Sequence, residues 1–195
     1  MQPQANAPAA PKLGRAKVLI NLLRDKLHER GAEIGVQQGD TSFQLLEALP
    51  DLQTLFCIDS WQWYAEYEHD RCAGDKTGGR WPDQDMLDAA FKTFMQRLHD
   101  KHLESRVVVL PMFEADAIGY VTDENLDFAF LDANHSYEYT RDAICRWKPK
   151  VRPGGLLAGH DYRNPHNPAW GVTRAVDEAF PYVDCGSDFT WWAWR

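Results

Sequence analysis

The sequence predicts an α/β fold in which helices cover both faces of a mostly parallel β-sheet. Short apolar or β-branched runs of strand length recur along the chain, and segments with helical spacing of apolar residues separate them. Strands that alternate with helices pair in parallel and bury both faces of their sheet. The chain has 195 residues, 44% of them apolar, which suits one domain and is too short for two ordinary ones.

The N-terminal half starts with an expected helix over residues 16–30, where apolar side chains recur at helical spacing and Gly31 supplies the stop. A short strand over 32–36 leads into a glycine-containing turn. A helix then runs from 41 or 42 to 49, where a proline ends it. A second buried strand is expected over 55–59.

The same alternation continues through the C-terminal half. Helical spacing returns over 83–102, and two aspartates near its start favour the positive end of a helix. The remaining elements are read from β-branched runs, a Pro-Gly-Gly turn at 153–155 and two further helical patterns. In chain order they are a strand over 107–110, a strand over 128–131, a helix over 137–147, a strand over 156–158, a helix over 171–180 and a strand over 189–194.

Two segments do not follow this alternation. Residues 1–12 are rich in Gln, Pro and Ala and have little to bury, so we expect a disordered tail that precedes a single domain over 13–195. Residues 60–82 combine aromatic side chains with glycines and show no clean period, which indicates a long insertion. Long loops of this kind are often lids or binding loops, so Trp61 and Trp81 are candidates for substrate contact. The alternative is a helix and loop that cap the core with aromatic side chains.

The charge balance, the lack of long apolar stretches and the cysteine spacing each disfavour a class of partner or a location. Acidic residues outnumber basic ones by 29 to 21, which gives a net charge of −8 and disfavours general binding to nucleic acids or anionic membranes. No apolar stretch reaches the roughly 20 residues of a membrane span, and the first residues lack the features of a signal peptide. The four cysteines are scattered without a C-x-x-C pair, which fits a reducing compartment and argues against a zinc cluster. We therefore expect a cytoplasmic protein, and a homo-oligomer is compatible with the sequence.

The first chemical motif joins a strand to a helix. Residues 33–39 form the pattern E-x-G-x-x-x-G, in which Gly35 and Gly39 allow a ligand to approach the backbone and the next helix offers free N–H groups. Asp59 follows at the end of the next strand, twenty residues after Gly39 (59 minus 39), where a carboxylate can accept hydrogen bonds from a ribose. The glycines can also serve packing alone, and the aspartate can be a turn cap.

Further motifs lie in the C-terminal half. They are D-x-x-H-S-Y at 132–137, P-G-G at 153–155 and G-H-D-Y at 159–162. Taken together and in this order, they resemble the class I S-adenosylmethionine-dependent methyltransferases. More narrowly, they are similar to the branch with bacterial sugar and small-molecule O-methyltransferases, over about residues 31–194. The resemblance implies a Rossmann-like methyltransferase fold with a seven-stranded, mostly parallel, doubly wound sheet.

This resemblance also implies a binding site for the methyl donor. The donor's amine would lie near Glu33, its carboxylate at the first turn and the following helix, and its ribose at Asp59. Relatives commonly have a Gly-Asp-Ser type of sequence after the third strand, whereas this chain departs from it with Pro-Met-Phe-Glu at 111–114. Phe113 would be an apolar wall for the adenine, and Ser60 and Trp61 are alternative neighbours. The expected donor-binding residues are Glu33, Gly35, Gly39, Asp59, Ser60 and Phe113.

Acceptor chemistry is expected at the ends of two inner strands. Asp132 and Asp161 should converge there and suit Mg²⁺, although both can equally be turn caps. His160 stands where the sugar-modifying relatives have a third acidic residue, which shifts the preference towards Mn²⁺, Fe²⁺ or Zn²⁺ if it ligates. His135 is the expected general base, with Asp132 beside it, unless it caps the helix. Tyr162 is a further candidate for substrate contact.

The leading hypothesis is methyl transfer to a hydroxyl of a small polar acceptor, such as a sugar or a glycosylated metabolite. The first alternative is a catechol or phenol O-methyltransferase, in which a metal chelates two hydroxyls. The second is a nucleoside-binding domain without turnover, because a fold does not establish an activity. The sequence lacks the N/D-P-P-Y/F signature of amino methylation on nucleic-acid bases.

Overall fold

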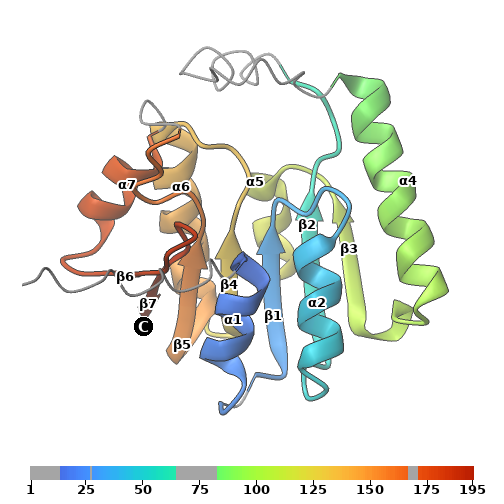
Figure 1. Cartoon of the computed structure of the whole chain (residues 1–195), viewed down its shortest axis with the longest axis horizontal. Coiled ribbons are helices and arrows are strands. Elements are labelled where there is room, and N and C mark those ends of the chain that lie inside the picture. The colour runs from blue at the N-terminus through green and yellow to red at the C-terminus, as the bar shows by residue number, and fades with distance from the viewer. Residues whose placement is uncertain (1–13, 27, 65–82, 167–170) are drawn as a thin grey trace, which may run out of the picture.

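The computed structural model describes residues 14–26, 28–64, 83–166 and 171–195, which form one seven-stranded sheet (Figure 1). The sheet has the order β3-β2-β1-β4-β5-β7-β6. Strands β1 to β5 are parallel, and β7 runs antiparallel to both β5 and β6. The strands are β1 (Arg30–Ile34), β2 (Thr54–Asp59), β3 (Val107–Pro111), β4 (Leu126–Leu131), β5 (Val151–Gly159), β6 (Asp184–Cys185) and β7 (Trp191–Trp194).

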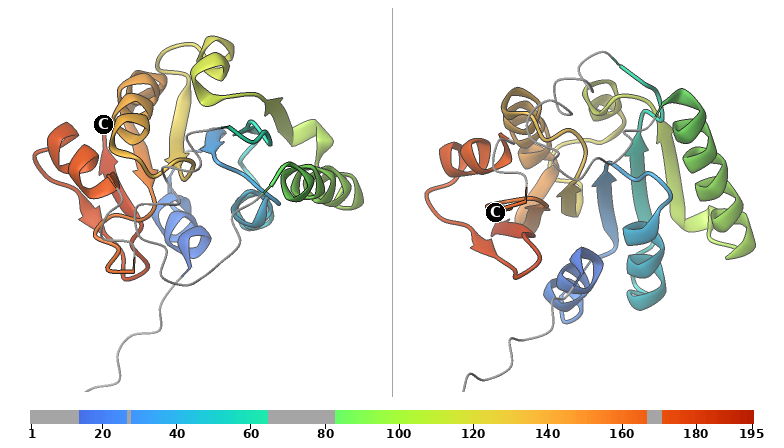
Figure 2. Two further views of the ribbon diagram at one scale, coloured as in Figure 1. Left: turned by 90° about the horizontal axis from the view of Figure 1, so that it is seen from above. Right: turned by 45° about the horizontal axis from the view of Figure 1, so that its top comes forward.

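Helices cover both faces of the sheet, as Figure 2 shows from above. The helices are α1 (Arg15–Leu23), α2 (Asp40–Ala48), α4 (Gln84–Asp100), α5 (Glu114–Ala117), α6 (Tyr137–Trp147) and α7 (Val172–Ala179), with short 3-10 turns at Glu104–Arg106, Ile118–Tyr120 and Lys148–Lys150. Alternate side chains of β4 separate the two cores: Phe128 and Phe130 pack with α1, α2 and α4, while Ala129 and Leu131 pack with α6 and α7. The doubly wound α/β expectation is therefore confirmed.

Helix α1 is shorter than the sequence predicts. It ends at Leu23 instead of residue 30, and Gly31 lies inside β1 instead of ending the helix. A Cβ atom at Gly31 would approach the ring of Phe128 to 2.1 Å, so a neighbouring strand's aromatic ring requires this glycine. The spacing of apolar residues is helical beyond Leu23. However, the residues from Arg30 onwards form β1, because they pair with β2 and β4.

Strand β5 also differs from the expectation. The Pro-Gly-Gly segment lies within this strand instead of preceding it. Leu126 pairs with Val151 and Phe128 pairs with Leu156, so the segment between them bulges out of register with β4. The two-residue strand β6 and the four-residue helix α5 were not predicted, because both are too short to show a periodic pattern.

Several expectations concern residues that the structure does not describe. The tail over 1–12 lies outside the described residues, and so does the segment 65–82, which holds most of the expected insertion. Within the described part of the chain, no helix has both the length and the apolar character of a membrane span. The carboxyl ends of β1 to β5 meet at one edge of the sheet, and their loops define the region of interest.

Candidate active site

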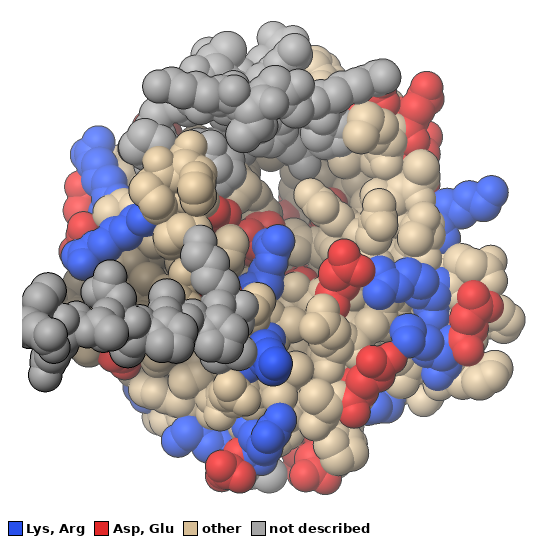
Figure 3. All heavy atoms as spheres, in the orientation of Figure 1, with Lys and Arg blue, Asp and Glu red and all other residues tan. Residues whose placement is uncertain are grey.

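A cavity of about 440 Å³ opens at the carboxyl edge of the parallel strands. Residues that follow β1, β2, β3 and β4 line it, together with side chains from α6. The space-filling view shows the molecule hollowed at this edge, with acidic and basic side chains beside the opening (Figure 3). A volume in this range suits a small organic ligand or cofactor.

The turn after β1 depends on its two glycines. Gly35 has a φ of +92°, and a Cβ atom there would lie 2.1 Å from the carbonyl oxygen of Asp132. Gly35 lines the cavity, as expected. Gly39, at the start of α2, has a φ of +80°, and a Cβ atom there would collide with the rings of Phe43 and Phe94. Gly39 is not among the described residues that line the cavity, so its visible role is packing.

Asp59 lies directly beside this turn. One carboxylate oxygen accepts hydrogen bonds from the main-chain N–H groups of Val36 and Gln37, both at 2.9 Å. The other oxygen accepts one from the N–H of Trp61 at 2.8 Å. A carboxylate offers about four lone-pair sites, so Asp59 joins the turn to β2 and keeps capacity for about one further donor.

Glu33 lies beneath the turn instead of facing the cavity. Its side chain is buried and accepts a hydrogen bond from the hydroxyl of Ser42 on α2, and Glu33 is not among the residues that line the cavity. Burial raises the pKa of Glu33 to about 8, only partly offset by that hydrogen bond. Burial also raises the pKa of the neighbouring Cys57 thiol. Its contact with the donor's amine, which the resemblance implies, therefore stays a prediction.

Two predicted site residues follow β2, and one of them lines the cavity while the other is buried in the core. Ser60 lines the cavity. Trp61 is only 4% exposed, packs against Phe91 and Phe94 at centroid distances of 4.7 and 5.5 Å, and donates its indole N–H to the carbonyl of Gln37 at 2.9 Å. Trp61 therefore supports the turn from below and does not present its ring to the cavity.

Tyr162, another expected acceptor contact, is also not brought to the cavity. Tyr162 is buried and donates its hydroxyl hydrogen to Asp177 at 2.6 Å, away from the cavity lining. Burial, reinforced by this hydrogen bond, raises the pKa of Tyr162 to about 12. Trp81 lies outside the described residues.

Three aromatic rings form a wall of the cavity. Phe113, which follows β3, lines it as expected. Tyr64 meets Phe113 edge to face at 5.6 Å and lies 6.1 Å from Tyr139 of α6. The Tyr64 hydroxyl accepts a hydrogen bond from the Asn134 side chain at 2.9 Å, which joins the loop after β2 to the loop after β4. Tyr64 and Tyr139 were not among the predicted site residues, although the aromatic content of segment 60–82 was a signal for Tyr64.

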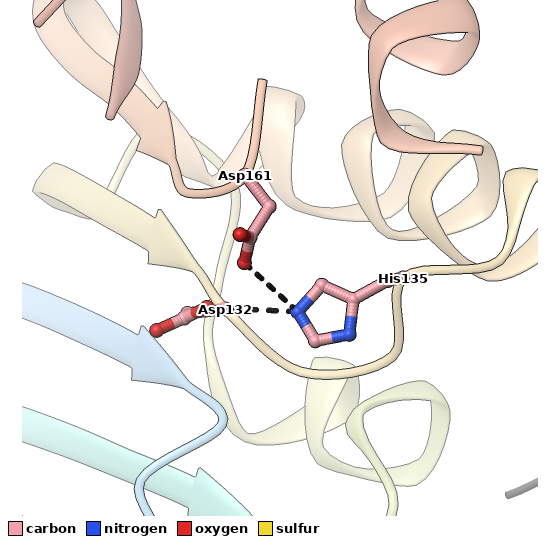
Figure 4. Close-up of side chains that lie close together, drawn as sticks. All are labelled: Asp132, His135 and Asp161. Carbon is pink, nitrogen blue, oxygen red and sulfur yellow. Dashed lines mark ion pairs between the residues drawn. The ribbon is translucent and has the colours of Figure 1, made fainter. Parts of the chain in front are cut away.

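Acidic and imidazole side chains meet where β4 and β5 end (Figure 4). The Nε2 atom of His135 lies 3.1 Å from Oδ2 of Asp161 and 4.0 Å from Oδ1 of Asp132. The Nδ1 atom of His160 lies 3.0 Å from the same Asp161 oxygen and 4.0 Å from the same Asp132 oxygen. The expected convergence of the two carboxylates is thus present, and both imidazoles face them.

Hydrogen bonds stabilise the negative charge of the Asp161 carboxylate in this cluster. Burial on its own would raise the pKa of Asp161, but hydrogen bonds from His135 and His160 outweigh it and hold the pKa below the usual range of an aspartate. The Asn164 side chain donates a further hydrogen bond to Asp161 at 2.6 Å. Arg15, at the start of α1, forms an ion pair with Oδ2 of Asp132, a contact that the sequence did not predict.

The donor atoms of this cluster fit a divalent cation. One ligand atom each from Asp132, His135 and Asp161 lie within 4.8 Å of one another. Ligands on a common ion at about 2.1 Å can be separated by up to about 4.2 Å, so small side-chain adjustments suffice. The set contains His135, whereas the sequence analysis placed His160 beside the two aspartates. Both rings contact the same oxygen of Asp161, at 3.1 Å for His135 and 3.0 Å for His160.

A second ion pair lies at another end of the cavity. Arg146 of α6 donates to both oxygens of Glu114, and the indole N–H of Trp147 donates to Glu114 at 2.9 Å. Both Glu114 and Arg146 line the cavity. No sequence pattern pairs them, because they lie on different helices.

Comparison with known proteins identifies the fold and the family. Residues 32–162 match the family described as "Methyltransferase domain". The chain belongs to this methyltransferase family. The match includes the turn after β1, Asp59 and the cluster around Asp161, and it confirms the class I resemblance. A comparison with curated protein sequences finds no significant match.

Solved structures of methyltransferases share the fold. The O-methyltransferase NovP has a TM-score of 0.69 at 21% identity, with 93% of this chain and 79% of that chain covered. A putative caffeoyl-CoA O-methyltransferase from Staphylococcus aureus has a TM-score of 0.63 at 16% identity, covering 93% and 83% of the two chains. An O-methyltransferase from Bacillus cereus, in complex with SAH, has a TM-score of 0.63 at 14% identity and covers 98% and 83%.

Proposed function

We propose that this methyltransferase uses S-adenosylmethionine to methylate a hydroxyl of a small polar acceptor, such as a sugar or a glycosylated metabolite. One observation carries the proposal. The turn at Gly35 and Asp59 and the side chains of Asp132, His135 and His160 border the same cavity. A site that can bind a nucleoside therefore lies next to groups that can accept a proton. Two proteins with a similar fold support the choice of donor: the O-methyltransferase TomG from Streptomyces achromogenes in complex with SAM, and the O-methyltransferase from Bacillus cereus in complex with SAH.

The residues along the strand ends fit the donor part by part. Phe113 and Tyr64 offer aromatic faces for a base, and Asp59 with Ser60 offers polar contacts for a ribose. The turn at Gly35 brings the backbone close to the ligand, since no side chain intervenes there. S-adenosylmethionine, when bound, supplies a methyl group on a positively charged sulfur. The chain's own contribution is to hold the acceptor oxygen in line with that methyl group.

His135 is the proposed general base. Its Nε2 atom hydrogen-bonds Asp161, which favours the tautomer with the lone pair on Nδ1 and stabilises the ring when it becomes charged. Oxygen attack forms the O–C bond as the C–S bond breaks, and the hydroxyl proton passes to the imidazole. Asp161 thereby orients His135 and compensates its positive charge, in the way that a carboxylate supports a catalytic histidine.

A divalent cation is proposed at the same carboxylates. Asp132 and Asp161 would hold it with the imidazole of His160, and it would supply Lewis-acid polarisation of an acceptor hydroxyl. A sugar hydroxyl is a weak acid, so such polarisation matters more for a sugar than for a phenol. The aromatic wall of Tyr64, Phe113 and Tyr139 offers stacking faces for a ring-shaped acceptor.

The test is a labelled-methyl assay with a panel of sugars, glycosides, catechols and phenols. The proposal predicts labelled product from a sugar or glycoside, with loss of turnover when a chelator is present. Product from catechols alone would contradict the acceptor class. Chelator-insensitive turnover would contradict the metal. Absence of product from the whole panel despite tight donor binding would indicate a binding domain without turnover.

A His135→Ala variant tests the base. We expect turnover to fall by about two orders of magnitude while donor affinity changes little, because the side chain acts on the acceptor proton. The matched control is His166→Ala, since His166 is exposed on the loop after β5. Equal turnover in the His135 variant and the control would exclude His135 as the base.

A further inference from the structure

A cation that the preceding proposal does not use lies beside the cavity wall, where it contacts the lining residue Asp132 without lining the cavity itself in the described structure. Arg15 begins α1, and its guanidinium forms an ion pair with Oδ2 of Asp132. It also lies close enough to Glu33 for its positive charge to lower the pKa of that carboxyl group. The Arg15 side chain remains 44% exposed. An arginine thus lies near the ends of β1 and β4, and part of its side chain is exposed to solvent beside Asp132.

The packing of helix α1 determines where Arg15 lies. Leu19, Ile20 and Leu23 of α1 belong to the core formed with α2 and β4. The helix is therefore anchored by apolar contacts along its length. Arg15 is at the end of the helix that points to the carboxyl edge of the sheet, because its partner Asp132 directly follows β4. The guanidinium is placed by the fold, and its ion pair is not what holds the helix in place.

The order of the strands indicates which part of a donor would reach Arg15. This step rests on the proposed function. Phe113 follows β3, Asp59 ends β2, Gly35 follows β1 and Asp132 follows β4, and these four strands are neighbours in that order. A donor with its base at Phe113 and its ribose at Asp59 therefore places its amino-acid part at β1 and β4. Three strand spacings of about 4.8 Å separate the two ends.

The amino-acid part carries a carboxylate, and the cavity offers few cations for it. Arg146 is the one arginine or lysine among the described residues that line the cavity, and it is paired with Glu114 at the other end. Asp59, Asp132 and Asp161 are acidic, so they would repel a carboxylate unless a cation lay among them. Arg15 is the cation at the correct end, and a guanidinium pairs with carboxylates in a two-bonded geometry.

We propose that Arg15 binds the α-carboxylate of the methyl donor. The guanidinium has five N–H donors, so it can turn towards the donor's carboxylate and either keep or release its bond to Asp132. In the second case, donor binding frees one oxygen of Asp132 for the acceptor side of the site. Arg15 is thereby a residue that selects donors with an intact amino-acid part over decarboxylated ones.

The experiment compares two ligands by calorimetry. They are S-adenosylhomocysteine and its decarboxylated analogue, S-adenosyl-3-thiopropylamine, which differ only in the carboxylate. With the wild-type protein, we expect tighter binding of S-adenosylhomocysteine. In the Arg15→Gln variant, we expect its affinity to fall by about tenfold or more, while the affinity for the decarboxylated analogue changes by less than about twofold.

Two further variants complete the design. Arg15→Lys keeps the charge and should recover part of the preference for S-adenosylhomocysteine, and it serves as the informative variant if Arg15→Gln does not fold. Arg24→Gln is the matched control, because Arg24 is exposed at the other end of α1. This variant should bind both ligands as the wild type does.

The outcomes separate this inference from the proposed function. Equal weakening of both ligands in Arg15→Gln, or unchanged binding of both, would overturn the carboxylate assignment while leaving the donor proposal intact. A wild-type protein that does not discriminate between the two ligands would also overturn it. A wild-type protein that binds neither ligand would instead contradict the proposed function.

Discussion

The buried carboxyl group of Glu33 makes the stability of this protein depend on pH. Its pKa is raised from 4.5 to about 8 in the folded chain, mainly by burial. Between these two values the unfolded chain loses the proton and the folded chain keeps it. The contribution of Glu33 to the free energy of unfolding is therefore largest below pH 4.5 and falls as the pH rises towards 8. A Glu33→Gln variant cannot ionise, so it should lose this dependence.

The size of the expected change in unfolding free energy follows from the raised pKa of Glu33. Each pKa unit corresponds to about 1.36 kcal/mol, so ionisation of Glu33 in the unfolded chain costs the folded state about 2 kcal/mol at pH 6 and about 4 kcal/mol at pH 7.5. The difference in unfolding free energy between Glu33→Gln and wild type should thus move by about 2 kcal/mol in favour of the variant over this interval. Any constant cost of the amide, such as an imperfect bond to Ser42, cancels in this comparison.

Urea unfolding followed by tryptophan fluorescence at pH 6.0, 6.75 and 7.5 measures this difference. The matched control is Glu47→Gln on the same helix as Ser42, because the Glu47 side chain is 54% exposed. The control should keep the wild-type pH dependence. A difference between Glu33→Gln and wild type that stays constant over the three pH values would refute the reasoning. It would mean that Glu33 is ionised in the folded protein or reaches water.

Three further predictions concern the turn after β1 and its supports. Trp61→Phe keeps a packed aromatic ring but removes the indole N–H bond to the Gln37 carbonyl. Donor affinity measured by calorimetry should therefore fall by about fivefold, while the KM for the acceptor stays unchanged. A raised KM for the acceptor alone would instead support a role of Trp61 in substrate contact. Gly35→Ala should abolish donor binding and lower the unfolding free energy by several kcal/mol, because a Cβ atom would lie 2.1 Å from the Asp132 carbonyl; wild-type affinity would contradict this. Arg106→Gln should lower the free energy of unfolding in urea by about 1–3 kcal/mol, because the Arg106 guanidinium donates hydrogen bonds to three main-chain carbonyls at the end of α2. An unchanged urea midpoint would show that water replaces these hydrogen bonds.

The strand-end acids were predictable because parallel strands share one edge. Asp59, Asp132 and Asp161 each follow an apolar run, and the alternation of strands and helices places the ends of those runs together. The glycine turn was recognisable for a similar reason, since Gly35 must leave room where two strand ends meet. In these cases the local pattern and the direction of the strand contain the required information.

The direction of individual side chains was not predictable in the same way. Glu33 and Trp61 lie next to the turn in sequence, yet both point into the core, because Ser42 of α2 and the aromatic side chains of α4 provide their partners. Tyr162 turns towards Asp177 of α7 for the same reason. Each choice depends on a helix that packs against the turn from a distant part of the chain.

The amino-acid sequence by itself therefore determined the α/β class, the order of most elements and the acids that gather at one edge of the sheet. Spacing along the chain specifies these features, because they depend on periodicity and strand direction. Only the tertiary structure decided that both histidines contact Asp161, that Glu33 is buried and that Arg15 meets Asp132 across 117 residues. These contacts join elements whose separation carries no local signal, so packing of the complete fold establishes them.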